Sequence, residues 1–211
     1  MHELDTLADQ SPHLVEAYDA TRPEFTRYAT DVEAWLDQHH QAYDKVDAAI
    51  LASLDRTDAI GLRLALKLAE SRRLVSALQE PVTVTLLNPV YKETGRLQRR
   101  SEHPHGEDSL RTKVAALRGL EELNPNFRAR VIVIDDECPE GSGELARRIL
   151  DEYDDPERYR VLFLGEAIDR GDPRLPPGLT HKDGDRRSVK GGSVLYGMRT
   201  GLADVVEGRH I

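Results

Sequence analysis

The chain has 211 residues, of which 39% are hydrophobic and 32% charged, and its formal net charge is -9. This composition is typical of a folded protein with a well-solvated surface, and the length suits one full core or a modest core with a helical appendage. The negative charge argues against a nucleic-acid partner, because a broad nucleic-acid interface needs a basic face.

The cysteine content and the N-terminus bear on the cell compartment. Cys138 is the only cysteine, which excludes an internal disulfide and favours a reducing environment. The first residues lack the basic start and apolar run of a secretory signal, and no stretch approaches the roughly 20 apolar residues of a membrane helix. We therefore expect a cytoplasmic protein with no membrane span.

Residues 1–80 form the first predicted domain, which is helical. Apolar side chains recur at steps of three and four over residues 25–50 and 60–78, with a polar break at residues 55–58. This pattern predicts two long amphipathic helices in an antiparallel hairpin. The hairpin could support the next domain or join two copies as a homo-oligomer, and the sequence leaves both interpretations open.

Residues 81–211 form the second predicted domain, which begins at Pro81 because proline cannot continue a helix. Three apolar runs are typical of parallel strands covered on both faces: Val82–Leu87, Val131–Ile134 and Val161–Leu164. Helical stretches follow them at Ser109–Leu123, Gly143–Tyr153 and Gly192–Leu202. This alternation predicts an α/β fold with a doubly wound, mostly parallel sheet.

Ligands of such sheets bind outside the carboxyl ends of the strands. After the first predicted strand, Pro89 ends the strand, Tyr91 offers a flat face to a nucleobase, and Glu93 can accept hydrogen bonds from the edge of the base. An ordinary exit from strand to loop explains this segment equally well.

The second predicted strand is followed directly by Asp135 and Asp136. Like charges beside a buried strand are unfavourable unless hydrogen-bond donors meet them, as the N–H of a uracil-like base and ribose hydroxyls would. Gly141 and Gly143 allow a tight entry into the next helix. Capping by Ser142 explains the start of that helix but not the two aspartates.

A third polar segment, Arg186–Ser193, precedes the last predicted helix. It places Arg186, Arg187 and Lys190 beside the pair Gly191-Gly192. Cations and backbone N–H groups at a helix start suit a diphosphate, although an exposed basic loop is the alternative interpretation.

In order and spacing, the three segments resemble the family 2 inverting glycosyltransferases, which have the GT-A fold. Pro89–Glu93 resembles the family's Pro-x-Tyr-Asn-Glu-like segment, Asp135–Ser142 its Asp-Asp-x-Ser-x-Asp-Gly-Ser/Thr segment, and Lys190–Ser193 its Lys-Gly-x-Ala helix start. The resemblance covers about residues 81–211.

This resemblance implies a glycosyltransferase that moves a sugar from a UDP- or GDP-sugar to an acceptor, with this chain holding the donor-nucleotide half. It implies that the following residues bind the nucleotide: Pro89, Tyr91, Glu93, Asp135, Asp136, Lys190 and Gly191.

It also implies a divalent metal, Mg²⁺ or Mn²⁺, on the donor diphosphate. The family's metal-binding Asp-x-Asp follows its next strand, and His210-Ile211 is similar to the start of that strand. We therefore expect neither metal ligands nor a catalytic base within residues 1–211, and no turnover by these residues alone.

Two other classes of function remain open. Gly141, Gly143 and Ala146 fit the G-x-G-x-x-A fingerprint of an NAD(P)-binding Rossmann fold, with Glu166 as the ribose-binding acid at a strand end, although residues 135–140 separate the strand from the first glycine. The chain could also be a non-catalytic nucleotide-binding or interaction module.

A metal site is a further alternative for the loop His103–Asp108, which contains two histidines one residue apart. Two histidines on an extended segment can bind a transition metal, but no partner pair at zinc-site spacing lies near them. A solvated loop is the competing interpretation.

Overall fold

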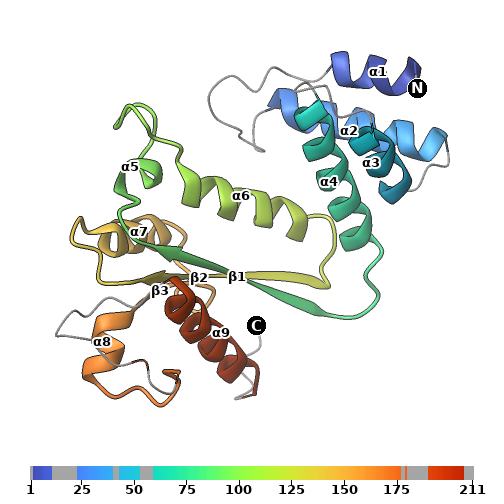
Figure 1. Cartoon of the computed structure of the whole chain (residues 1–211). Coiled ribbons are helices and arrows are strands. Elements are labelled where there is room, and N and C mark those ends of the chain that lie inside the picture. The colour runs from blue at the N-terminus through green and yellow to red at the C-terminus, as the bar shows by residue number, and fades with distance from the viewer. Residues whose placement is uncertain are drawn as a thin grey trace. The chain divides into compact units, whose positions relative to one another are not determined.

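The computed structural model of the protein describes residues 2–10, 23–39, 43–52, 59–176, 179 and 190–206. Its contacts divide the chain into two compact units (Figure 1). The first unit comprises Met1–Pro81 and Ala115–Phe127, and the second comprises Val82–Val114 and Arg128–Ile211. One boundary falls inside helix α6 (Ser109–Glu121), so this helix contributes to both units.

The first unit contains four helices in its described N-terminal part: α1 (His2–Asp9), α2 (Pro23–Gln38), α3 (Tyr43–Ala52) and α4 (Ala59–Ser76). Helix α4 contacts each of the other three. The core of this unit includes Phe25, Val32 and Leu36 of α2 and Leu62 and Leu66 of α4.

The predicted two-helix hairpin is not confirmed, because the first predicted segment is divided between α2 and α3. The physical reason lies at the end of α2. The Nδ1 atom of His39 lies 2.9 Å from the carbonyl oxygen of Trp35, and the two rings stack with centroids 4.6 Å apart. The carbonyl oxygen of Trp35 also accepts the backbone N–H of His39 at 3.0 Å. A side-chain contact of this kind to a backbone carbonyl competes with continuation of the helix.

Asn124 ties residues 115–127 to the end of α4. Its side-chain nitrogen donates to the carbonyl oxygens of Val75 at 2.9 Å and Leu78 at 3.0 Å, and it lies 3.2 Å from that of Ser76. The last carbonyl groups of a helix have no partner within the helix, so an outside donor stabilises them. Asn124 is 8% exposed, so water has little access to these carbonyl oxygens and cannot readily replace the amide as their donor.

The second unit is built on a sheet of three strands in the order β1-β2-β3. The strands are β1 (Val82–Val90), β2 (Phe127–Asp135) and β3 (Tyr159–Phe163). Strands β2 and β3 pair in parallel, in a register that runs from Val131 opposite Tyr159 to Asp135 opposite Phe163. The chain is thus an α/β protein with a small, open, parallel sheet, which is compatible with a Rossmann-like fold.

Burial differs among the strands according to their place in the sheet. Strand β2 is buried at every position except Arg128, as expected for a strand covered on both faces. Strands β1 and β3 lie at the edges and are partly exposed. The prediction of complete coverage is wrong for the start of β1, where Val82 and Val84 are 37% and 41% exposed.

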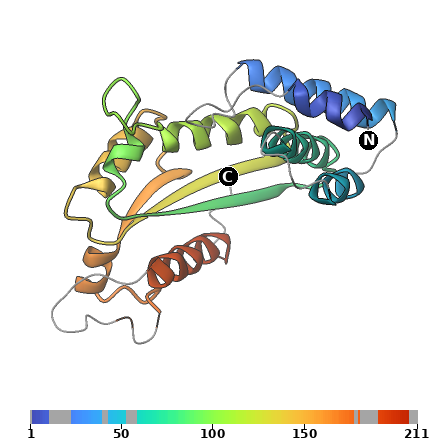
Figure 2. The same ribbon diagram turned by 45° about the horizontal axis from the view of Figure 1, so that its top comes forward.

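Helices lie on both faces of this sheet (Figures 1 and 2). Helix α7 (Ser142–Asp151) and the start of α6 lie on one face, and α8 (Leu164–Asp169) and α9 (Lys190–Val206) lie on the other. Helix α8 and the short α5 (Thr94–Leu97) were not predicted. Leu164, predicted as the end of the third strand, begins α8 instead.

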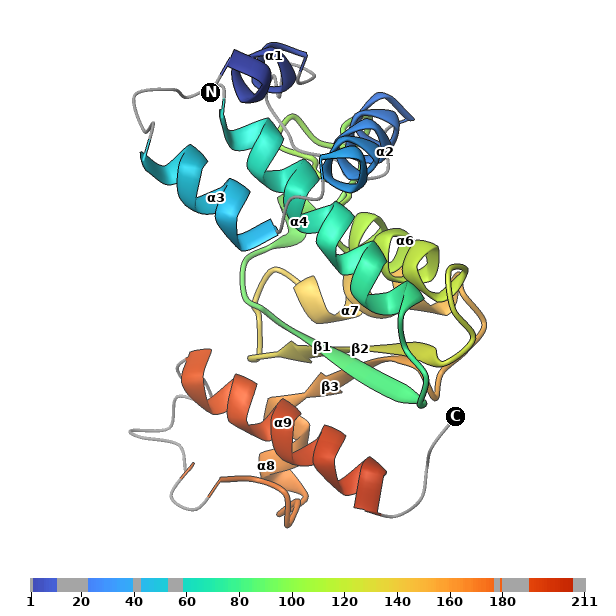
Figure 3. The same cartoon turned by 90° about the vertical axis from the view of Figure 1, so that its right-hand side faces the viewer.

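Helix α9 lies against one face of the sheet (Figure 3). Two of its glycines approach the strands closely. A Cβ atom on Gly197 would lie 2.8 Å from Cδ1 of Ile134 and 3.3 Å from Cδ2 of Leu87, and one on Gly201 would lie 3.7 Å from Cγ2 of Thr85. Helix α9 therefore runs antiparallel to β1. The N-terminus of α9 accordingly points to the carboxyl edge of the sheet.

None of the helices in the described part of the chain combines the length and hydropathy needed to cross a bilayer. The predicted strand start at His210 and Ile211 lies outside the described residues.

Replacing Asn124 by alanine should destabilise the first unit, because the carbonyls of Val75 and Leu78 would lose a buried donor. We expect the free energy of unfolding to fall by about 1–3 kcal/mol. The measurement is urea unfolding followed by the fluorescence of Trp35, the single tryptophan. Glu122→Ala, at an exposed position nearby, is the control and should have little effect. Equal stability of the two variants would contradict the role of Asn124.

Candidate functional site

The loops after β1 and β2 are joined at the carboxyl edge of the sheet. The backbone N–H of Lys92 donates to Sγ of Cys138 at 3.1 Å, and that of Glu93 donates to Oγ of Ser142 at 2.9 Å. The thiol of Cys138 and the hydroxyl of Ser142 also lie 3.1 Å apart. Two of the three predicted polar segments therefore form one continuous surface.

Cys138 has a larger role in this junction than the sequence indicates. Burial alone would raise the pKa of its thiol, but hydrogen bonds from Ser142 and from the N–H of Lys92 outweigh burial and lower that pKa. The side chain is 9% exposed. The thiol thus serves as a buried hydrogen-bonding group that holds the first loop against the second.

Both loops turn through the left-handed region at residues other than glycine. Lys92 has a φ of 56° and Glu137 a φ of 53°. Such conformations cost on the order of 1 kcal/mol or more and persist only where the surroundings impose them. Here the hydrogen bonds of Lys92 and Glu93 to the second loop supply that constraint.

Asp135 and Asp136 are both buried at this edge. Oδ2 of Asp135 accepts the N–H of Cys138 at 3.2 Å, so this carboxylate shapes the turn into α7, a role that the sequence did not reveal. Its Oδ1 is buried without a hydrogen-bond partner among the described residues. Desolvation by burial raises the pKa of Asp135 to about 6. Asp136 is 6% exposed, and its N–H lies 3.4 Å from the carbonyl oxygen of Val90 at the end of β1.

The glycines after β2 are explained by packing. A Cβ atom on Gly143 would lie 2.6 Å from Cγ of Asp135 and 2.7 Å from Cε1 of Phe163, closer than real side chains approach. Gly141 precedes α7 with a φ of 73°. Both features of the G-x-G pattern therefore have a local structural cause.

The location predicted for the ribose-binding acid of a dinucleotide site is wrong. Strand β3 ends at Phe163, and Glu166 lies in the first turn of α8 instead of at a strand end. Its carboxylate pairs with Arg170 at 3.1 Å, and the side chain is 63% exposed.

The third predicted segment is described only from its helix onwards. Lys190 and Gly191 form the first turn of α9, and this turn points to the carboxyl edge. Arg186, Arg187 and the side chain of Lys190 lie outside the described residues. Gly191 is exposed, and a Cβ there would meet no atom within 4 Å.

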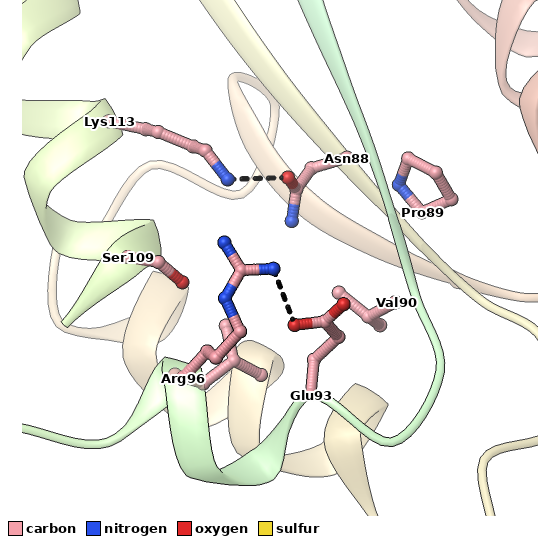
Figure 4. A pocket seen from close by; sticks show the side chains of 8 residues that line it. Asn88, Pro89, Val90, Glu93, Arg96, Ser109 and Lys113 are labelled. Atoms are coloured by element: carbon pink, nitrogen blue, oxygen red, sulfur yellow. Dashed lines mark hydrogen bonds and ion pairs between the residues drawn. The ribbon is translucent and has the colours of Figure 1, made fainter. Parts of the chain in front are cut away.

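A cavity of about 150 Å³ lies between the end of β1, α5 and the start of α6 (Figure 4). Its lining residues are Asn88, Pro89, Val90, Glu93, Arg96, Leu97, Ser109 and Lys113. Of the predicted nucleotide-binding residues, Pro89 and Glu93 belong to this lining. The carboxylate of Glu93 pairs with Nη1 of Arg96 at 3.0 Å.

Sequence reasoning missed the cationic half of this cavity. Nζ of Lys113 donates to Oδ1 of Asn88 at 2.8 Å. Burial and then the charge of Arg96 lower the pKa of Lys113 below its usual value. Lys113 lies one turn after Ser109, at the start of a predicted helix, and this position is the one sign in the sequence of a cation there. No pattern in the sequence connects Lys113 with Asn88.

The loop His103–Asp108 is held by backbone and ionic contacts. Nδ1 of His103 accepts the N–H of His105 at 3.1 Å, and Asp108 pairs with Arg111 at 2.7 Å. No group of three His, Cys, Asp or Glu side chains that could hold a metal is found in the described part of the chain. The loop hypothesis for a metal thus gains no support from these contacts.

Asp172, to which the sequence assigned no role, ties the segment after α8 to α9. Its carboxylate accepts hydrogen bonds from Arg174 at 2.6 and 2.9 Å and from the hydroxyl of Tyr196 at 2.9 Å. The bonds from Arg174 hold the pKa of Asp172 well below its usual value. Tyr196 is among the largest fully buried side chains, so this contact fixes α9 along its buried face.

Comparison of the chain with protein-family models, with curated proteins and with solved structures finds no match.

The buried carboxyl of Asp135 should make stability fall as pH rises. Its pKa is raised from 3.8 to about 6, so the folded state binds this proton more tightly than the unfolded state. The resulting stabilisation is present below pH 4 and is lost as pH rises through 6. Asp135→Asn removes this dependence. Between pH 5 and pH 7.5, the free energy of unfolding of the variant should therefore rise relative to that of the wild type by about 1–3 kcal/mol, as measured by calorimetry. A constant difference would contradict the raised pKa.

Gly143→Ala should destabilise the second unit, because its methyl group would overlap Asp135 and Phe163. We expect a loss of about 1–3 kcal/mol in the free energy of unfolding, measured by calorimetry. Gly191→Ala is the matched control, since open space surrounds that position, and it should not destabilise the fold. Unchanged stability of Gly143→Ala would show that the close approach is dispensable.

Proposed function

We propose that this chain binds the nucleotide of a nucleotide-diphosphate sugar, as the donor half of a GT-A-type glycosyltransferase. The observation that carries the proposal is the junction of the loops after β1 and β2, in which Lys92 and Glu93 donate to Cys138 and Ser142. This junction brings Tyr91 and the buried Asp136 to one edge of a parallel sheet, the edge at which such sheets bind ligands.

The base, the ribose and the diphosphate of the donor each have a suitable group at this edge. Tyr91 is half-buried and offers a ring face for stacking with a base. A carboxylate at Asp136 can accept the N–H of a base or the hydroxyls of ribose. The start of α9 provides backbone N–H groups and a favourable helix dipole for a diphosphate, with Lys190 as its first residue.

A divalent metal would neutralise the leaving diphosphate in the complete reaction. The described residues do not fit such a metal, since they contain no group of three candidate ligands. We therefore derive no step through a metal and propose for these residues only the binding and orientation of the nucleotide.

A nucleotide panel tests this proposal. Isothermal titration calorimetry with UDP, GDP, NAD⁺ and NADP⁺, each with and without Mn²⁺, should give binding of UDP or GDP and none of the dinucleotides. Asp136→Asn should weaken this binding about tenfold or more, because a buried charged acceptor is lost. Asp151→Asn, at an exposed position on α7, is the matched control and should bind as the wild type does.

Two outcomes would overturn the proposal. Binding of NAD⁺ or NADP⁺ without UDP or GDP would favour the dinucleotide fold. Absence of binding to any nucleotide would favour a non-catalytic interaction module.

A further inference from the structure

We propose that the cavity beside β1, lined by Lys113 and Arg96, binds the carboxylate of a small organic acid. The cavity lies between the end of β1, α5 and the start of α6 (Figure 4). Lys113, Arg96, Ser109 and Asn88 have no role in the proposed nucleotide site, whereas Pro89 and Glu93 belong to both sets of residues. The proposal does not depend on nucleotide binding.

Lys113 provides the first reason. Its ammonium group is half-buried and has one hydrogen-bond partner among the described residues, the neutral amide oxygen of Asn88 at 2.8 Å. No carboxylate in the described part of the chain forms an ion pair with it. Glu93 and Glu107 attract this ammonium group only from beyond ion-pair distance. A partly desolvated ammonium group with no anion in direct contact is unfavourable, and a carboxylate in the cavity would supply one.

Arg96 provides the second reason. Its Nη1 pairs with Glu93 at 3.0 Å and its Nε pairs with Glu107 at 2.9 Å. These two carboxylates fix the plane of the guanidinium group, which lies between Ser109 and Glu93 and below Lys113 in the view of Figure 4. A guanidinium group held in this way is oriented in advance for a further planar carboxylate.

The count of charges favours a monoanion. Lys113 and Arg96 carry two positive charges, and Glu93 and Glu107 carry two negative ones. A carboxylate would leave the group with one net negative charge, whereas a phosphate dianion would leave it with two in a half-buried space. Repulsion by the two glutamates therefore disfavours phosphate.

Size and the neutral groups define the rest of the ligand. A cavity of about 150 Å³ has the volume known to admit a six-carbon ring, so an acid of about six non-hydrogen atoms fits. Ser109, at the start of the 13-residue helix α6, and Asn88 offer a hydroxyl and an amide for a ligand hydroxyl group. The N-terminus of α6 adds a favourable dipole for the anion.

The test is an NMR titration of the ¹⁵N-labelled chain with sodium lactate at constant ionic strength. Lactate should shift the backbone amides of residues 88–97 and 109–113. Lactamide, which has the same shape without the charge, should not shift them. Inorganic phosphate should bind more weakly than lactate. Equal responses to lactate and lactamide, or tighter binding of phosphate, would overturn the assignment.

Two variants connect the response to the cavity. Lys113→Met should weaken lactate binding about tenfold or more, since it removes the unpaired cation. Arg148→Met, which removes a cation from the exposed face of α7, should leave lactate binding unchanged. Wild-type affinity in Lys113→Met would refute the site.

Glu107→Gln is a second test that spares the interior of the cavity, because Glu107 is an exposed side chain outside the lining. The amide oxygen of glutamine can still accept the Nε–H of Arg96, so the guanidinium group keeps its orientation. The change removes only one repelling charge, so lactate should bind several-fold more tightly. Unchanged or weaker binding would count against the proposal. UDP binding is measured separately, so failure of the nucleotide proposal and failure of this one are distinguishable.

Discussion

The junction between the loops after β1 and β2 is the contact on which the carboxyl edge depends. Two backbone N–H groups of the first loop, at Lys92 and Glu93, donate to side chains of the second, Cys138 and Ser142. Because backbone groups are the donors, these two bonds constrain the path of the first loop directly. The acceptors are buried, which protects both bonds from water. Tyr91 and the cavity-lining Glu93 therefore belong to one loop that is bonded to the second.

This edge also contains a conflict between folding and chemistry. Asp135 shapes the turn into α7 through its bond to the N–H of Cys138, yet burial disfavours its charge and raises its pKa to about 6. Gly143 lets α7 approach this carboxyl closely. The nearby Asp136 is also buried, and repulsion between the two carboxyls is among the causes of the raised pKa. Two buried carboxyl groups side by side lower the stability of the fold, and we therefore connect the pair with ligand binding.

Strands and crossover helices could be predicted from the sequence because their causes are local. Apolar runs identified the three strands, and helical periodicity identified α6, α7 and α9 to within a few residues. The break between α2 and α3 escaped prediction, since apolar residues continue across it at helical spacing.

Predictions of side-chain roles were less complete, because those roles depend on partners distant in sequence. Asp135 and Asp136 were recognised as unusual, but the turn-forming bond of Asp135 was not. The cavity was missed, since Asn88 and Lys113 meet only after β1 and α6 pack together. Asp172 was left without a role for the same reason, as its partner Tyr196 follows 24 residues later. Gly197 and Gly201 gave no signal of the sheet that they contact.

Helix α9 buries Tyr196 and two glycines, while several of its other large apolar residues lie on the exposed side. Gly197 and Gly201 face the sheet, while Leu195, Met198 and Leu202 are 44%, 56% and 63% exposed. Because a Cβ atom on Gly197 would lie 2.8 Å from Ile134, added atoms on the inner side should do more harm than lost atoms on the outer side. Mutational tolerance along α9 should accordingly run against hydrophobicity: the residues that a hydropathy plot marks as core are the replaceable ones, and the glycines are the constrained ones.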